Sequence, residues 1–341
     1  MKKKKVLIVG GAGFIGSHIN KMLDDAGYST IVLDNLSTGN RKSVVRGTFV
    51  EGDLNDTKLL DKIFKTYHID AVMHFAAFID VGESVHHPLK YYQNNVANTL
   101  NLLSAMHRHN VNIFIFSSTA AIFGIPQENT IREDHPKHPI NPYGSSKLMV
   151  EEMLTSFDAA YGIKFSALRY FNAAGGDPDG EIQNFKKKET NLIPIVLRNL
   201  MQNNQPITIN GTDYPTPDGT CIRDYIHIYD LGLAHIKAME QLMEGQNSTY
   251  YNLGNGKGFS VKEVIQCASE VVNITPKIIL GERRAGDPPF LLADSEKAYK
   301  ELNWKPQYPE LKTIIEHAFR ALHHPPSFKG CKTAMDEMDI K

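Results

Sequence analysis

Apolar and polar residues follow two different patterns along the first half of the chain. Short, almost unbroken apolar runs are typical of strands buried on both faces, and apolar residues three and four positions apart are typical of amphipathic helices. The apolar runs predict strands at 6–9, 30–34, 47–53, 70–77, 111–118 and 164–171. The helical spacing predicts helices at 16–26, 57–67, 89–109 and 141–161.

This regular alternation of strand and helix predicts an α/β fold with a doubly wound parallel sheet of the Rossmann type. After about residue 175 the pattern changes, because 177–189 is polar and rich in helix breakers. Beyond it we expect a smaller C-terminal α/β substrate lobe. Its predicted strands are 206–209, 249–253 and 277–280, and its predicted helices are 192–203, 229–243 and 260–272.

Three regions follow from this pattern. Residues 1–175 are expected to form a nucleotide-binding domain. Residues 176–324 are expected to form mainly the substrate-binding lobe, with some segments returning to the first domain. Residues 325–341 lack apolar periodicity and are expected to be a flexible tail.

Composition narrows the possible partners. Apolar residues make up 42% of the 341 residues, and the formal charge is −1, so no basic field would attract nucleic acid. No apolar run approaches the ~20 residues of a membrane span. The three cysteines lack CxxC spacing and the histidines lack an HExxH motif, so we expect neither a disulfide framework nor a metal site.

The N-terminal stretch KKKKVLIVGGAGFIGS has two readings. Lysines before an apolar run resemble a secretory signal, but that signal needs an apolar region of about 7–15 residues. Here the apolar run of 6–9 is interrupted by glycines. We therefore expect a strand, a tight turn and a helix, in a protein that stays in the cytoplasm.

Three glycines follow the first predicted strand. Gly10 permits a tight turn, Gly13 lets the backbone approach a pyrophosphate, and Gly16 allows close packing of helix on strand. The phosphates would then lie at a helix N-terminus, where free N–H groups attract anions. The spacing is GxxGxxG, a weak signal by itself, and its alternative is an ordinary turn.

Two acidic residues strengthen the nucleotide interpretation. Asp34 ends the second strand about 20 residues after the glycines, where an acid binds the ribose hydroxyls. A carboxylate there repels a 2′-phosphate, which favours NAD over NADP. Asp53 follows the third strand and suits the edge of the adenine ring.

A second motif, YGSSK, places Tyr143 and Lys147 four residues apart and therefore on one face of a helix. A free tyrosine with a pKa of about 10 is a poor base, but a nearby ammonium group favours the phenolate. We expect Lys147, together with a positively charged nicotinamide ring, to lower the pKa of Tyr143. Thr119 ends the fifth strand, at the sheet edge where open α/β sheets bind ligands. An exposed Tyr–Lys pair is the alternative reading of YGSSK alone.

With these motifs in this order, the sequence resembles the extended short-chain dehydrogenase/reductase family, and most closely its members that epimerise nucleotide sugars. The resemblance covers about residues 4–320. It is carried by GGAGFIGSH (10–18), DNLSTG (34–39), HFAA (74–77), VGES (81–84), YYQNN (91–95), FSSTAAIFG (116–124), NPYGSSK (141–147), RYFNAAG (169–175), NGTDYPTPDGTCIRDYIH (210–227), YNLGNGKGFSVKEV (251–264) and RRAGDP (283–288).

The resemblance implies an NAD-dependent isomerase that inverts C4 and interconverts UDP-galactose and UDP-glucose through a 4-keto sugar, as part of galactose metabolism. Tyr143, Lys147 and Thr119 would be catalytic. The implied cofactor contacts are Gly10, Gly13, Phe14, Ile15, Gly16, Asp34, Asn35, Asp53, Leu54, Phe75, Ala76, Ala77, Asn94, Asn95, Ser117, Tyr143, Lys147 and Tyr170. The implied contacts to the UDP-sugar substrate are Thr119, Tyr143, Asn172, Asn191, Leu192, Arg223, Arg284, Asp287 and Leu291. The family usually forms homodimers through helices placed here at about 89–109 and 143–161.

Departures from the family pattern keep some alternatives open. Many members have serine at the position of Thr119, some have a cofactor-contacting lysine at that of Ile79, and Leu291 lies where side-chain size is thought to gate N-acetylated sugars. Epimerisation of UDP-GlcNAc/UDP-GalNAc, a pentose or a uronate is therefore the main alternative. A dehydratase or decarboxylase would have an acid directly after Thr119, where this chain has Ala120. A binding protein that has lost catalysis would lack Tyr143 or Lys147.

Overall fold

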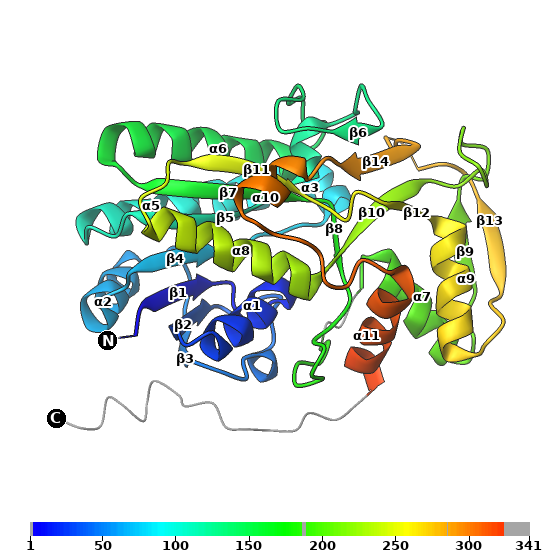
Figure 1. Ribbon diagram of the computed structural model, residues 1–341, viewed down its shortest axis with the longest axis horizontal. Coiled ribbons are helices and arrows are strands. Elements are labelled where there is room, and N and C mark those ends of the chain that lie inside the picture. The colour runs from blue at the N-terminus through cyan, green and yellow to red at the C-terminus, as the bar shows by residue number, and fades with distance from the viewer. Residues whose placement is uncertain (1–2, 186–188, 285, 324–341) are drawn as a thin grey trace.

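Seven parallel strands form the large sheet of the computed structural model, which describes residues 3–185, 189–284 and 286–323 (Figure 1). The strand order is β11–β7–β5–β4–β1–β2–β3, so the chain winds outward from β1 in both directions. The predicted doubly wound sheet is confirmed. The strands are β1 (Lys5–Val9), β2 (Ser29–Asp34), β3 (Thr48–Glu51), β4 (Ala71–His74), β5 (Ile113–Thr119), β7 (Lys164–Tyr170) and β11 (Thr249–Leu253).

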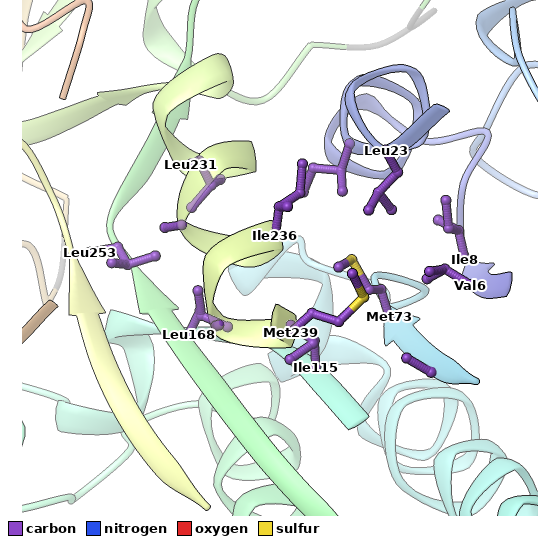
Figure 2. Close-up of a cluster of buried hydrophobic side chains, with 14 of the residues drawn as sticks. Val6, Ile8, Leu23, Met73, Ile115, Leu168, Leu231, Ile236, Met239 and Leu253 are labelled. Atoms are coloured by element: carbon purple, nitrogen blue, oxygen red, sulfur yellow. The ribbon is translucent and has the colours of Figure 1, made fainter. Parts of the chain in front are cut away.

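Helices cover both faces of this sheet, which explains why its strands are mainly apolar. One face packs against α1 (Phe14–Asp25) and α8 (Ile228–Met243), and Figure 2 shows the buried side chains between them and the strands. The other face packs against α2 (Thr57–Tyr67), α5 (Asn98–Arg108) and α6 (Pro142–Tyr161).

The lobe contains two small sheets and a third hydrophobic core. The first sheet contains β12 (Gly258–Ser260), β10 (Ile222–His227), β14 (Phe290–Ala293), β6 (Thr130–Ile131) and β8 (Asn172–Ala174). The second pairs β9 (Ile207–Asn210) with β13 (Ile278–Gly281). The core lies between α7 (Leu192–Met201), α9 (Val261–Val272) and α11 (Leu311–His323).

Short elements complete the described fold. They are η1 (Arg41–Ser43), α3 (Val81–His86), α4 (Pro88–Tyr91), the π-helical η2 (Tyr92–Ala97), the 3₁₀-helical η3 (Ala120–Phe123) and α10 (Glu296–Glu301).

The structure differs from the sequence prediction in several elements. The single helix expected at 89–109 is divided into α4, η2 and α5. The strand and helix expected in the lobe at 249–253 and 229–243 are β11 and α8, which complete the large sheet and its covering layer. The predicted flexible tail, 325–341, lies outside the described residues.

Candidate active site

A cavity of about 860 Å³ lies at the carboxyl ends of the large sheet's strands and extends to the lobe. Its wall contains the glycine turn after β1, the start of α6, and residues of β10 and the segment before β14. Almost every predicted site residue contributes to this wall. The exception is Asn95.

The glycine turn shapes the end of the cavity next to β1. Gly10 has a φ of +80°, and a Cβ there would lie 2.7 Å from Ala76 Cα. A Cβ on Gly16 would lie 2.8 Å from Gly11 Cα. The turn therefore has no room for side chains at these two positions, and the open N-terminus of α1 faces the cavity. These features fit a bound pyrophosphate, as predicted for NAD.

Acidic and amide groups line the cavity beyond this turn. Asp34 is buried, and its carboxylate accepts hydrogen bonds from Ala12 N at 2.9 Å and Leu36 N at 2.8 Å. Burial raises the pKa of Asp34, and these two hydrogen bonds oppose that shift. Asn35 Nδ2 donates to Asp53 Oδ2 at 2.5 Å. The position of Asp34 at the end of β2 suits a ribose with free hydroxyls better than one carrying a 2′-phosphate.

Asn95 does not line the cavity, in contrast to the sequence prediction. Its side chain is buried, accepts a hydrogen bond from Phe78 N at 2.9 Å, and donates to Phe78 O and Ser146 Oγ, each at 3.0 Å. Asn95 therefore connects η2 to α6 and to the segment after β4. Its neighbour Asn94 lines the cavity and donates to Asn95 Oδ1 at 3.0 Å.

The predicted catalytic residues meet where α6 begins. Asn141 caps this helix by accepting a hydrogen bond from Gly144 N at 2.9 Å, and Pro142 occupies the first turn. This start directs Tyr143 and Lys147 toward the end of β5. The Thr119 hydroxyl hydrogen-bonds the Tyr143 side chain, and Lys147 Nζ donates to Ser117 O at 2.8 Å.

Burial is the main influence on the ionisation of Tyr143 and Lys147. Burial raises the pKa of Tyr143, and the hydrogen bond from Thr119 opposes that shift. The lowering expected from Lys147 together with a nicotinamide ring is therefore opposed by burial. Burial instead lowers the pKa of Lys147 to about 7, against the opposing charge of Glu151. Desolvation therefore dominates the pKa of both side chains.

Ser117 and Tyr170 bring β5 and β7 together at the same cavity wall. Ser117 Oγ and the Tyr170 hydroxyl form a short hydrogen bond. Burial raises the pKa of Tyr170, so its phenol is neutral. Both residues line the cavity.

Two arginines and one carboxylate line the lobe side. Arg223 on β10 pairs with Asp287 at 3.4 Å, and Arg284 pairs with the same carboxylate at 3.2 Å. Arg223 is largely buried and is held by Pro288 O at 2.8 Å, whereas Arg284 is exposed. Two guanidinium groups around one cavity suit a diphosphate, because arginine binds phosphate oxygens in a bidentate manner.

The remaining predicted substrate residues also lie in the wall. Asn172 donates to Asp224 O at 2.9 Å and thereby joins β8 to β10. Asn191 lies just before α7, and its side chain makes no capping hydrogen bond to this helix. Leu192 and Leu291 add apolar surface.

Sequence reasoning missed several residues of the cavity wall. These include Ser37, Asn40, Asn98, Phe185, Asn210 and Cys221. Asn98 donates to Asp53 at 3.4 Å, and its position one turn after Asn94 was an available signal. The others lie on loops or, for Asn210, at the end of β9, where no periodic pattern indicates which side chain faces a cavity.

Two further findings concern the described residues alone. No helix among them is long and apolar enough to cross a membrane. Nor does this part of the chain bring together three His, Cys, Asp or Glu side chains in a group that could hold a metal ion.

The doubly wound sheet, the glycine turn and the Tyr143–Lys147 pair define a dinucleotide-binding protein of the short-chain dehydrogenase/reductase class. More specifically, the chain belongs to the NAD dependent epimerase/dehydratase family, which residues 6–254 match.

Individual relatives are similar to this protein over almost the whole chain. It is 49% identical to the UDP-glucose 4-epimerase of Halalkalibacterium halodurans, over 92% of this chain and 94% of that protein. The structure is similar to that of UDP-glucose 4-epimerase from Brucella ovis in complex with NAD, with a TM-score of 0.91, 46% identity, and 93% and 97% of the two chains covered. The structure is also similar to that of the UDP-Glc/GlcNAc 4-epimerase from Campylobacter jejuni, with a TM-score of 0.82, 43% identity, and 93% and 98% of the two chains covered.

Proposed function

We propose that this protein interconverts UDP-galactose and UDP-glucose by inverting C4 of the sugar. The observation that carries this proposal is a single cavity with three kinds of residue in its wall. It contains a turn suited to a dinucleotide, the Tyr143–Thr119–Lys147 group, and two arginines suited to a second diphosphate.

Each end of the cavity has its own task. Residues 1–175 hold the cofactor through the glycine turn, Asp34 and Asp53, while the lobe within 176–324 holds UDP through Arg223 and Arg284. The sugar then lies between these ends, next to Tyr143. Bound NAD supplies a hydride acceptor that can return the hydride, together with a positively charged ring.

The protein's own residues control the proton. Tyr143 removes the proton of the 4-hydroxyl and later returns it, as general base and then general acid. Thr119 stabilises the phenolate through its hydrogen bond, and the Lys147 ammonium, held by Ser117 O, adds positive charge beside it. Tyr143 needs this charge, because burial alone favours its neutral form.

A coupled assay tests the proposal. Purified protein is incubated with UDP-galactose without added NAD, and UDP-glucose is quantified. Conversion is expected, because the deep cavity retains the cofactor during purification. An absence of UDP-glucose, both with and without added NAD, would refute the proposed reaction.

A broader sugar specificity is the second candidate. Leu291 lies in the cavity wall and packs against the buried cluster that contains Phe123, rather than filling the space with an aromatic ring. One similar structure is named a UDP-Glc/GlcNAc 4-epimerase. Parallel assays with UDP-GalNAc would show whether this chain shares that range, and Leu291→Tyr should reduce such activity more than activity on UDP-galactose.

We further propose a homodimer in which the segments around α4–α5 and α6 face a second copy. Apolar side chains are exposed there, including Leu89 on α4 at 71%, Leu100 on α5 at 44% and Met149 on α6 at 42%.

Light scattering should give the mass of a dimer, and Leu100→Glu combined with Met149→Glu should dissociate this dimer. Leu280→Glu is the matched control, since Leu280 is 66% exposed but lies on β13. A monomeric wild-type protein would contradict this proposal.

The described thiols, Cys221 and Cys267, are free, as expected for a protein working in the reducing cytoplasm. We include that location in the proposal, and fractionation of cells would test it.

A further inference from the structure

Glu151 lies on α6 four residues after Lys147, just as Lys147 lies four residues after Tyr143. Residues four apart lie on the same helix face, so these three side chains occupy successive turns of one face. Glu151 is buried, with a side chain only 3% exposed, and it does not line the cavity. A carboxylate so deeply buried next to a catalytic lysine requires an explanation.

The Glu151 carboxylate is fixed by two neighbouring strands. It accepts hydrogen bonds from Ser118 Oγ at 2.6 Å and from Arg169 Nε and Nη2 at 2.9 and 2.7 Å. Ser118 on β5 and Arg169 on β7 are partners in the strand register. Glu151 therefore fixes α6 against the two strands that end at the catalytic group.

Consecutive residues of β5 hold Lys147 and Glu151. The Ser117 carbonyl accepts the hydrogen bond from Lys147 Nζ at 2.8 Å, and the Ser118 hydroxyl donates to Glu151. The distance between the lysine and the carboxylate is thus set by one peptide unit of β5 and one turn of α6. The described ion pairs join Glu151 to Arg169 and none joins it to Lys147, so Glu151 acts on Lys147 through space.

The other groups near this site do not replace the negative charge of Glu151. His74 on β4 is neutral, because burial lowers its pKa to about 3, and burial raises the pKa values of Tyr143 and Tyr170. Arg169 and Lys137 are cations that interact with Glu151 or lie close to it. Glu151 is the group that opposes the loss of the Lys147 proton on burial.

Stability alone does not account for this arrangement. A buried ion pair often stabilises a protein no better than well-packed apolar residues of similar volume, because both charges lose their hydration. The Arg169–Glu151 pair is buried on both sides, with side chains 1% and 3% exposed. Because Glu151 lies one helical turn after Lys147 on α6, we infer that the pair has a second role.

We propose that Glu151, held by Ser118 and Arg169, is a positioning residue that keeps Lys147 protonated and directed at the cavity. This inference rests on the proposed epimerase function. The expected consequence is a rate that declines at alkaline pH as Lys147 loses its proton, at a pH that depends on Glu151.

The test is the pH dependence of kcat for conversion of UDP-galactose by the purified holoenzyme. In Glu151→Gln, which retains shape but removes the charge, the alkaline decline should move to lower pH by on the order of one pH unit. Glu152→Gln, at the adjacent exposed position, should keep the wild-type profile. A Glu151→Gln profile that is lowered uniformly, without moving along the pH axis, would show a purely structural role and overturn the proposal.

A second variant covers the case in which Glu151→Gln leaves Arg169 unpaired and the protein fails to fold. Glu151→Leu combined with Arg169→Met removes both charges and should fold, with the same shift of the alkaline decline. A wild-type profile in this double variant would also overturn the proposal. Because wild-type protein is assayed alongside, its failure to convert UDP-galactose would be distinguished as failure of the proposed function itself.

Discussion

Among single residues, Tyr143 is the one whose environment most directly opposes its proposed task. Burial raises its pKa, and the hydrogen bond from Thr119 opposes this shift. Tyr143→Phe removes the hydroxyl and little packing, so kcat should fall by about 10²–10⁴-fold with unchanged thermal stability. Tyr161→Phe, at the exposed end of the same helix, is the control. Activity of Tyr143→Phe near the wild-type level would show that another group is the base.

Asp34 provides a separate test at the residue scale. In Asp34→Asn the side chain loses its charge and one of its two acceptor positions, so the protein should retain NAD on the order of tenfold less tightly and discriminate less against NADP. The measurement is the amount and identity of the dinucleotide released on denaturation. Asp56→Asn keeps a helix cap and should leave both unchanged. Recovery of NADP from the wild-type protein would contradict the role given to Asp34.

Much of the site could be predicted from single residues, because its motifs stand at strand ends. Asp34 and Thr119 are examples, and both line the cavity. What sequence could not supply is the balance between charge and burial. Lys147 next to Tyr143 suggests a lowered tyrosine pKa, yet desolvation decides the direction for both residues. The burial of Glu151 is equally invisible, since a glutamate on a helix is usually exposed.

At the scale of elements, the glycine turn controls how closely α1 approaches β1. A Cβ at position 16 would lie 2.8 Å from Gly11 Cα and would push the helix away from the turn. Gly16→Ala should therefore cost about 1–3 kcal/mol of the free energy of unfolding and reduce the bound cofactor. Urea denaturation and dinucleotide content measure the two effects.

Gly82→Ala is the matched control, because its nearest neighbour would be Asp80 Oδ1 at 3.5 Å. Full cofactor content and wild-type stability in Gly16→Ala would show that the close approach of helix and turn is not required.

The regularity of the apolar spacing affected how accurately individual helices and strands could be predicted. Helix α2 has the predicted bounds because its apolar spacing is regular and Asp56 caps it by accepting from Leu59 N at 3.0 Å. Strand β10 was missed because Arg223 and Asp224 interrupt its apolar run. The π-helical η2 could not be predicted either, since it depends on the contacts of Asn95 with Phe78 and Ser146, which are distant in sequence.

For the whole molecule, buried neutral histidines should govern stability in acid. Burial lowers the pKa of His235 to about 4, from 6.5 when unfolded. Because the unfolded chain binds the proton more readily, this contribution to stability is complete above pH 6.5 and is lost as the pH falls toward 4. At pH 5 the loss is about 2 kcal/mol. Asp224 and Asp230 act in the opposite direction, since burial raises their pKa values to about 6.

A variant separates the effect of His235 on acid stability from the opposite effect of Asp224 and Asp230. His235→Phe should lose less stability than the wild-type protein between pH 7.5 and pH 5, as measured by urea denaturation at both values. His86→Phe, at an exposed position, should follow the wild type. An equal loss of stability in wild type and His235→Phe would mean that His235 is not a source of acid sensitivity.

In the proposed epimerisation, one protein molecule holds cofactor and sugar together, so that the hydrogen removed from C4 returns to C4. The most direct test is to convert UDP-galactose carrying deuterium at C4 and to analyse the UDP-glucose by mass spectrometry and NMR. The product is expected to keep its deuterium at C4 and to acquire none of the solvent's hydrogen there. Product that has exchanged this position with water would contradict it.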